Sequence, residues 1–164
     1  MATVFGSLAD YAKGGVQVID DDPKNYVFSN IFEVAAKGTP FERIAVAKNF
    51  EYVIEAVRAE GLSPWYACAH DEFALCMDGE IEITLVKLDE PEAAVDPKSQ
   101  GARCLTADPK GRRMGRMVIR RGHLALLPVG AAYRFEAVSP SAMMIQTIEG
   151  PLTLSRWSEI CQQD

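Results

Sequence analysis

The chain has 164 residues, of which 48% are hydrophobic and 24% charged, and it carries a formal net charge of −6. This length and composition indicate one globular domain, and the negative charge argues against a nucleic acid or an anionic membrane as a partner, since both attract positive surfaces. No apolar run approaches the roughly 20 residues that cross a bilayer, and the N-terminus has no basic segment ahead of an apolar core, so we expect a cytoplasmic protein.

The first forty residues differ from the rest of the chain in their glycine, proline and aspartate turn signals. We predict that residues 1–40 form an N-terminal arm with one or two short helices. The clearest helix signal is SNIFEVAAKG at 29–38, where Ser29 or Asn30 can cap the first turn and Gly38 can end the helix. Two roles are open for this arm: a flap packed over the rest of the chain, or a segment that wraps a partner.

From residue 41 onward the chain has the pattern of short β-strands separated by turns. Residues 51–59 (EYVIEAVRA) fit either a helical stripe or a strand face, and their valine and isoleucine content favours the strand. Short strands at this spacing, without long helices between them, indicate an all-β sandwich or barrel. The predicted strands lie at 42–48, 51–59, 73–78, 81–88, 116–122, 123–130, 132–138 and 143–149.

Two further segments interrupt or follow these strands. Residues 89–113 are rich in Glu, Asp, Pro, Lys and Gly and are predicted to form a long loop. The basic stretch KGRRMGR at 110–116 is predicted to be either a solvated loop tip or an anion site. At the end of the chain, LSRWSEICQQ (154–163) is predicted to be a short amphipathic helix that lays Trp157 and Ile160 on the strands.

Two clusters of the sequence carry a recognisable spacing of glycine, proline and glutamate. They are HDEFALCMDGEIEI at 70–83 and GHLALLPVGAAYRFEAV at 122–138, and they resemble the two motifs of the cupin family. The resemblance implies a small jelly-roll barrel over residues 41–164, with the short C-terminal helix at its end. The matched positions are Glu72, Gly79, Gly122, Pro128 and Gly130.

The positions at which cupins bind a metal ion do not match. The histidine pair of the first motif would fall at Tyr66 and Cys68, or at Trp65 and Ala67, and Tyr133 stands where the second motif has its histidine. A catalytic metal centre generally needs about three or four converging ligands. We therefore predict no metal ligand and no catalytic residue in this chain. The candidates for a vestigial pocket are Tyr66, Cys68, His70, Glu72 and Tyr133.

Two other functions stay open on these residues alone. A metal-independent isomerase or epimerase of a sugar derivative would use His70 as the base and Tyr133 as the acid across the barrel. His70 precedes Glu72 by two positions, so a strand would place both side chains on one side. A barrel of this kind could also be a small-molecule-binding sensor domain that performs no chemistry.

Over essentially its whole length, the chain resembles the small subunit of hydroquinone 1,2-dioxygenases, most clearly in residues 1–38 and in SPWYACAHDEFALCMDGEIEITLVKLDEP (63–91). The resemblance implies a heterotetrameric, Fe(II)-dependent enzyme that opens hydroquinone with dioxygen to 4-hydroxymuconic semialdehyde during breakdown of 4-nitrophenol and related phenols. It also implies that the large subunit holds the iron, and that this chain is a metal-free partner that stabilises or closes the large subunit's active site. The expected contacts are the exposed sheet edge and the apolar arm residues Tyr11, Tyr26, Phe28, Ile31 and Phe32.

Overall fold

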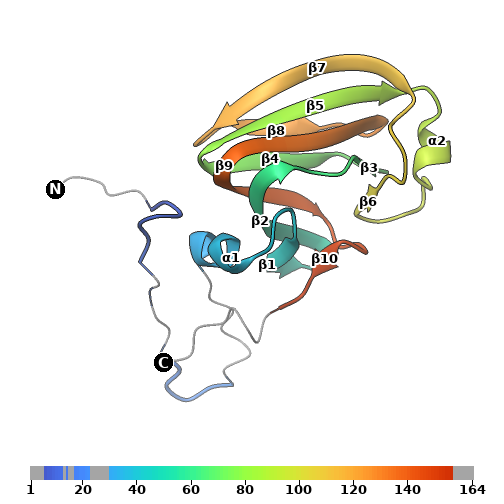
Figure 1. Cartoon of the computed structure of the whole chain (residues 1–164). Coiled ribbons are helices and arrows are strands. Elements are labelled where there is room, and N and C mark those ends of the chain that lie inside the picture. The colour runs from blue at the N-terminus through green and yellow to red at the C-terminus, as the bar shows by residue number, and fades with distance from the viewer. Residues whose placement is uncertain (1–5, 13, 15–16, 23–29, 157–164) are drawn as a thin grey trace.

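The computed structural model describes residues 6–12, 14, 17–22 and 30–156, and strands dominate this part of the chain (Figure 1). The prediction of an all-β jelly-roll barrel is confirmed. No helix among these residues is long and apolar enough to cross a membrane. The elements are α1 (Ile31–Lys37), β1 (Arg43–Asn49), β2 (Tyr52–Leu62), β3 (Tyr66–Cys68), β4 (Glu72–Asp78), β5 (Glu80–Leu88), α2 (Pro91–Ala94), β6 (Ala102–Cys104), β7 (Gly111–Arg120), β8 (Leu124–Leu127), β9 (Ala131–Ile148) and β10 (Thr153–Leu154).

Strand β9, with 18 residues, holds the curled sheet together because its two halves pair with different neighbours. Its second half lies antiparallel between β2 and β4, and β1, β10 and β8 continue the sheet on either side. Its first half pairs with β5 and β3, and β7 and β6 flank those strands. Figure 1 shows β9 running the length of the barrel between these two groups. One long strand therefore fixes the positions of residues that lie far apart in sequence.

The barrel interior is filled by the inward-facing side chains of alternating strand residues. In β9 these include Tyr133 and Phe135, and in β5 they include Ile81 and Ile83, all at most 1% exposed. Phe41 closes one end of the barrel by stacking on Phe135, with ring centroids 6.5 Å apart. The buried cluster consists of Val57, Ala59, Tyr66, Ala74, Cys76, Ile81, Ile83, Leu85, Ile119, Ala125, Leu127, Ala131, Tyr133, Phe135, Ala137, Met143 and Ile145.

Helix α1 forms where the cap signals predicted it, and Asn30 is the capping residue. Its side-chain oxygen accepts hydrogen bonds from the backbone N–H groups of Phe32 and Glu33 at 2.9 and 3.4 Å. The helix ends at Gly38, whose N–H bonds to Val34. The buried side of α1 packs on the outer face of β1 and β2. Among the arm residues named above, Tyr26 and Phe28 lie outside the described residues. Of the C-terminal helix predicted at 154–163, residues 157–163 lie outside them too, whereas Leu154 belongs to β10.

The prediction of a loop tip at 110–116 is wrong, because β7 begins at Gly111 and pairs with β5 as far as Arg120. Backbone pairing overrides the low strand propensity of the Arg-rich and Gly-rich sequence. A side chain at Gly111 would place its Cβ 2.0 Å from the carbonyl oxygen of Lys87, so this register requires glycine. The connector before it contains α2 and β6 rather than unbroken loop.

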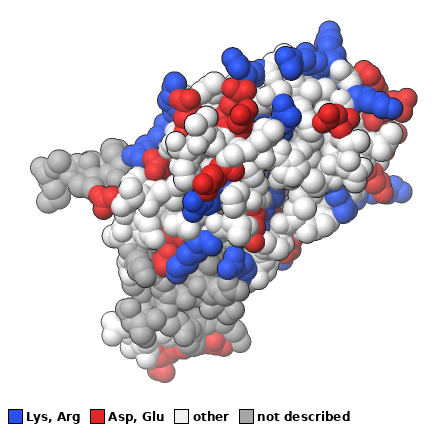
Figure 2. All heavy atoms as spheres, viewed as in Figure 1, with Lys and Arg blue, Asp and Glu red and all other residues white. Residues whose placement is uncertain are grey.

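The arginines of β7 do not form a field of one sign. Arg116 and Arg120 form ion pairs with Glu82 and Glu80 on the neighbouring β5, at 3.3 and 2.6 Å. Figure 2 shows the same mixture, with basic and acidic side chains interspersed along the upper rim where Figure 1 places β7 and β5. The basic stretch therefore lies on an exposed strand face, where Arg116 is paired with an acidic side chain of the neighbouring strand.

Two turn glycines share one backbone conformation but differ in how closely they are packed. Gly79 (φ 80°) and Gly122 (φ 87°) both adopt the left-handed conformation, which costs about 1–2 kcal/mol for a residue with a side chain. A Cβ at Gly79 would also lie 2.1 Å from Ser141 Oγ, whereas nothing lies within 4 Å at Gly122. We expect Gly79→Ala to lower the free energy of unfolding by a further ~1–3 kcal/mol relative to Gly122→Ala, measured by urea denaturation. Equal losses in the two variants would contradict the Gly79 packing.

Candidate functional site

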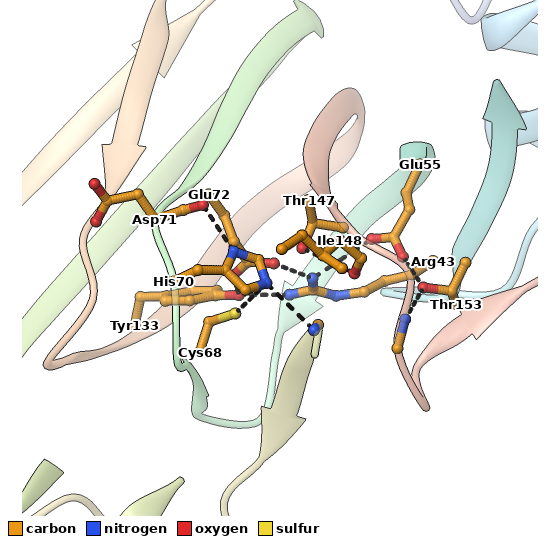
Figure 3. Close-up of polar contacts among 12 residues, drawn as sticks. Arg43, Glu55, Cys68, His70, Asp71, Glu72, Tyr133, Thr147, Ile148 and Thr153 are labelled. Carbon is orange, nitrogen blue, oxygen red and sulfur yellow. Dashed lines mark hydrogen bonds and ion pairs between the residues drawn. The ribbon is translucent and has the colours of Figure 1, made fainter. Parts of the chain in front are cut away.

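A cluster of polar side chains lies inside the barrel, at the level where cupin motifs place their ligands. It comprises Arg43 from β1, Glu55 from β2, Glu72 from β4 and Tyr133 from β9 (Figure 3). These side chains are only 3%, 1%, 0% and 1% exposed. Charged groups are rarely buried to this extent unless they are paired and hydrogen-bonded. The burial of these four side chains therefore depends on the contacts that they make with one another.

Arg43 is the centre of this cluster. One guanidinium nitrogen, Nη1, lies 3.2 Å from Glu72 Oε1 and 3.5 Å from Glu55 Oε2. The other, Nη2, donates to the Tyr133 hydroxyl at 2.7 Å, and that hydroxyl in turn donates to Glu72 Oε2. The guanidinium also lies over the ring of Tyr66, 4.8 Å from its centroid. Arg43 thus contacts side chains from four other strand positions at once.

The remaining polar atoms of the cluster are satisfied as well. Thr153 Oγ1, at the start of β10, donates to Glu55 Oε1 at 2.6 Å, so this carboxyl group has two partners. No buried side-chain nitrogen or oxygen of the described residues lacks a hydrogen-bond partner. A complete network of this kind is stable, whereas a partly satisfied one would destabilise the core.

The local environment fixes the charges of the cluster. Burial alone would lower the pKa of Arg43, but Tyr133 and the two carboxyl groups outweigh burial and raise it well above its usual value. Burial raises the pKa of Tyr133 well above its usual value, although Arg43 opposes this, so the phenol keeps its proton. Burial also raises the pKa of Glu55 against the opposing effects of Arg43 and Thr153. The centre therefore holds one permanent cation beside a protonated phenol.

The structure brings together three of the five pocket candidates. Tyr66, Glu72 and Tyr133 all contact Arg43. Cys68 and His70 instead form a separate pair, with Cys68 Sγ 3.1 Å from His70 Nε2. Burial, with a smaller effect from Glu72, raises the pKa of the Cys68 thiol to about 12, so this thiol stays protonated.

His70 does not lie on the strand with Glu72. Strand β4 begins at Glu72, and His70 lies in the bend before it, so the two-residue period does not apply. Its Nδ1 lies 2.9 Å from the carbonyl oxygen of Asp71, and its Nε2 accepts from the N–H of Gly101 at 3.2 Å. Both ring nitrogens are thus engaged, and no hydrogen bond among the described residues joins His70 to Tyr133. Both members of the acid–base pair of the epimerase hypothesis therefore have other hydrogen-bond partners, because the Tyr133 hydroxyl is bonded to Arg43 and Glu72.

The residues at the motif positions do not fit a metal ion. The two oxygens of Glu72 are bonded to Arg43 and to Tyr133, and the latter is a protonated phenol. Arg43 itself is a cation and would repel a divalent ion placed among the same groups. Within the described residues, no three or more His, Cys, Asp and Glu side chains are grouped in a way that could hold a metal. The guanidinium supplies the positive charge that a bound ion supplies in other sites of this type.

Sequence reasoning missed Arg43 and Glu55, the two charged members of the cluster on β1 and β2. A signal for Glu55 was present, because Val53, Glu55, Val57 and Ala59 are alternate residues of one strand and all are at most 1% exposed. A glutamate within an otherwise apolar inward row indicates a buried partner of opposite charge. Arg43, ten or more residues away, could not be identified as that partner without the register of β1 on β2.

The first prediction from this site concerns the buried charges. We expect Arg43→Met to lower the free energy of unfolding by about 3–5 kcal/mol, because Glu55 and Glu72 would lose their counter-charge. Arg43→Lys keeps the charge but loses the planar fork and is expected to cost less. Adding Glu55→Gln and Glu72→Gln to Arg43→Met should restore part of the loss in urea denaturation. An unchanged urea midpoint for Arg43→Met would contradict the structural role of the network.

The second prediction uses the raised pKa of Glu55. A carboxyl group whose pKa is higher in the folded state contributes stability that is fully present below its unfolded pKa of about 4.3 and is lost as the pH rises through the folded value. The free energy of unfolding of the unmodified chain, relative to Glu55→Gln, should therefore fall as the pH rises from about 4 to about 7. A difference that stays constant or rises over this range, measured by urea denaturation, would show that burial does not dominate at Glu55.

Comparison with solved structures matches the chain over its whole length, as two of the similar chains show. The chain is 64% identical to a chain of hydroquinone 1,2-dioxygenase from Sphingomonas sp. TTNP3 with 4-hydroxybenzoate bound, covering 100% of this chain and 99% of that chain with a TM-score of 0.96. It is 46% identical to a chain of hydroquinone 1,2-dioxygenase PnpCD in complex with Cd²⁺ and 4-hydroxybenzonitrile, covering 99% and 98% with a TM-score of 0.93. No protein-family model matches the chain, and a search of curated proteins found no match either.

A further match shares the fold alone. A chain of PnpCD in complex with Fe³⁺ superimposes with a TM-score of 0.61 at 12% identity, and the match covers 88% of this chain but 40% of that one. The PnpCD structures thus contain a chain of this length and a longer chain with a related barrel. Identity of 64% over the full length, together with the cupin barrel and its two motifs, shows that this chain belongs to the hydroquinone 1,2-dioxygenase family.

Proposed function

We propose that this chain is the non-catalytic, metal-free small subunit of a hetero-oligomeric, Fe(II)-dependent hydroquinone 1,2-dioxygenase. The enzyme would open hydroquinone with dioxygen to 4-hydroxymuconic semialdehyde, as in the breakdown of 4-nitrophenol. The observation that carries the proposal is the engagement of Glu72 and Tyr133, two of the motif positions for metal ligands, by the guanidinium of Arg43. The side chains at these two positions, which would bind iron in a catalytic barrel, are bonded here to the guanidinium of Arg43.

The partner in this proposal is the longer chain of the same enzyme. The PnpCD relatives contain such a chain, and their structures hold Fe³⁺ or Cd²⁺. If the barrel of the small chain cannot accept the metal, the longer chain has to hold it. The iron would supply the site at which dioxygen and the phenol react, and no residue of the small chain would contribute a ligand.

The role left for the small chain is to support that site from outside. A rigid barrel can stabilise the partner's fold and close one wall of its active site, which excludes water from a flat apolar substrate. The hydrogen-bonded interior around Arg43 favours such rigidity, because every described member has a partner. We also propose that residues 1–40 act as an arm distinct from the barrel at 41–164.

The two competing functions receive less support. The ring nitrogens of His70 are engaged by Asp71 and Gly101, and the Tyr133 hydroxyl is bonded to Arg43 and Glu72, so both members of the acid–base pair of a sugar isomerase have other partners. For a sensor domain, a cavity of about 620 Å³ beside α2 is lined by apolar groups such as Leu88 and Val129, together with Glu90 and Glu92. It contains no set of converging polar groups that would select one ligand.

The proposal predicts the behaviour of the separated chains. Purified alone, this chain should contain no stoichiometric iron by elemental analysis and should consume no dioxygen with hydroquinone in an oxygen electrode. Adding the longer chain reconstituted with Fe(II) should give ring cleavage. Formation of the semialdehyde is monitored through its absorbance. Turnover by this chain alone, or one equivalent of iron bound to it, would overturn the proposal.

A further inference from the structure

The outer face of the sheet formed by β2, β9, β4 and β8 is apolar where a solvated sheet would be polar. The register aligns outward-facing residues of these four strands into two rows. The first row is Ile54, Gln146, Phe73 and Leu126, and the second is Ala56, Met144, Leu75 and Leu124. Antiparallel sheets with one face in water normally alternate apolar-in with polar-out. Apolar side chains on both faces are typical of a sheet that is covered on both sides.

The chain itself covers only one end of this face. Helix α1 packs over the β2 end, where Ala56 is fully buried. At the other end, Phe73 on β4 is 39% exposed, and Leu124 and Leu126 on β8 are 63% and 45% exposed. Together with the half-buried Leu75, these residues form what we call the β4–β8 face. Its members are cross-strand neighbours, Phe73 beside Leu126 and Leu75 beside Leu124.

This face differs from the other exposed apolar residues of the chain. Val138 on β9 and Phe50 between β1 and β2 are more exposed, at 97% and 85%, but they lie between or beside polar residues rather than in a row of apolar neighbours. Isolated exposed apolar residues are normal, whereas contiguous ones mark interaction surfaces. A water-facing patch of four large apolar side chains, two on each of two adjacent strands, belongs to the second kind.

The open edge of β8 and the charged end of β4 border the β4–β8 face and indicate how a partner would bind to it. Within the described residues, β8 pairs only with β4, so its second backbone edge is open for a further strand. At one end of β4, Asp78 accepts a hydrogen bond from the N–H of Leu8 at 2.9 Å and pairs with Arg121 at 2.7 Å. The described part of the arm is thus anchored at the rim and leaves the apolar rows open. Rim charges around an apolar centre are the arrangement of a specific protein interface.

We propose that the β4–β8 face is the surface on which the longer dioxygenase chain docks, through the outer sheet of its own barrel. This inference rests on the proposed function and names the contact it requires. The longer chain of the PnpCD relative carries a barrel that superimposes on this one with a TM-score of 0.61. It therefore presents a sheet of the same shape, and two such sheets pack face to face over an apolar layer about 10 Å thick.

The test places charge on the face and measures assembly. The double variant Leu124→Glu and Leu126→Glu is compared with Val138→Glu, which places one such charge at a strand position outside the face. Association with the longer chain of the same host is followed by sedimentation velocity with purified, full-length chains. We expect the double variant to lose at least about 100-fold in affinity, because two charges would be buried without partners, and Val138→Glu to bind as the unmodified chain does.

The outcomes separate this inference from the proposed function. If the double variant binds the longer chain with unchanged affinity, the β4–β8 face is not the docking surface, although the subunit role stands. If the unmodified chain does not bind the longer chain at all, both fail. If the double variant instead dissociates a dimer of this chain, or lowers the thermal midpoint of the isolated chain, the face is covered by a second copy or by the chain's own residues, and the inference is overturned.

Discussion

The buried guanidinium of Arg43 is the constraint on which the rest of the barrel depends. It joins β1 to β2, β4 and β9 through Glu55, Glu72 and Tyr133, and Thr153 extends the network to β10. Burying these groups costs free energy, and their mutual attraction recovers it only when all of them stay in place. The network is therefore a weak source of net stability but a strict condition on strand register, since a one-residue shift would direct a charged side chain to the opposite face.

The same network shows how a cupin barrel can keep its shape while two of its motif positions are bonded to the chain's own guanidinium. Gly79 and Gly130 still form the tight turns of the two motifs, with φ of 80° and 78°. Glu72 and Tyr133 still point into the barrel, but their partner is a side chain of the chain itself. A covalently attached cation cannot exchange or change oxidation state. Such a centre joins β1 to β2, β4 and β9 through hydrogen bonds of its own side chains.

Sequence patterns predicted the parts of the structure that are determined locally. The Asn30 cap and the strand at 51–59 were each identified from residues within a few positions of one another. The partners of Arg43 could not be identified in this way, because Glu72 and Tyr133 are 29 and 90 residues away from it. Only the strand register of the folded chain brings them together. His70 was misplaced because strand alternation was extended past the true start of β4. Sequence patterns over a few residues failed wherever the pairing of distant strands determines where a side chain lies.

The central claim is that Arg43, and not a metal ion, occupies the space between Glu72 and Tyr133 in the working enzyme. X-ray anomalous difference maps at the iron absorption edge, from crystals of the iron-loaded enzyme with both chains, test it most directly. The account predicts an iron peak in the longer chain and none in the barrel of this chain, with Arg43 bonded to Glu72 and Tyr133. An iron peak between those two side chains, with Arg43 displaced, would contradict it.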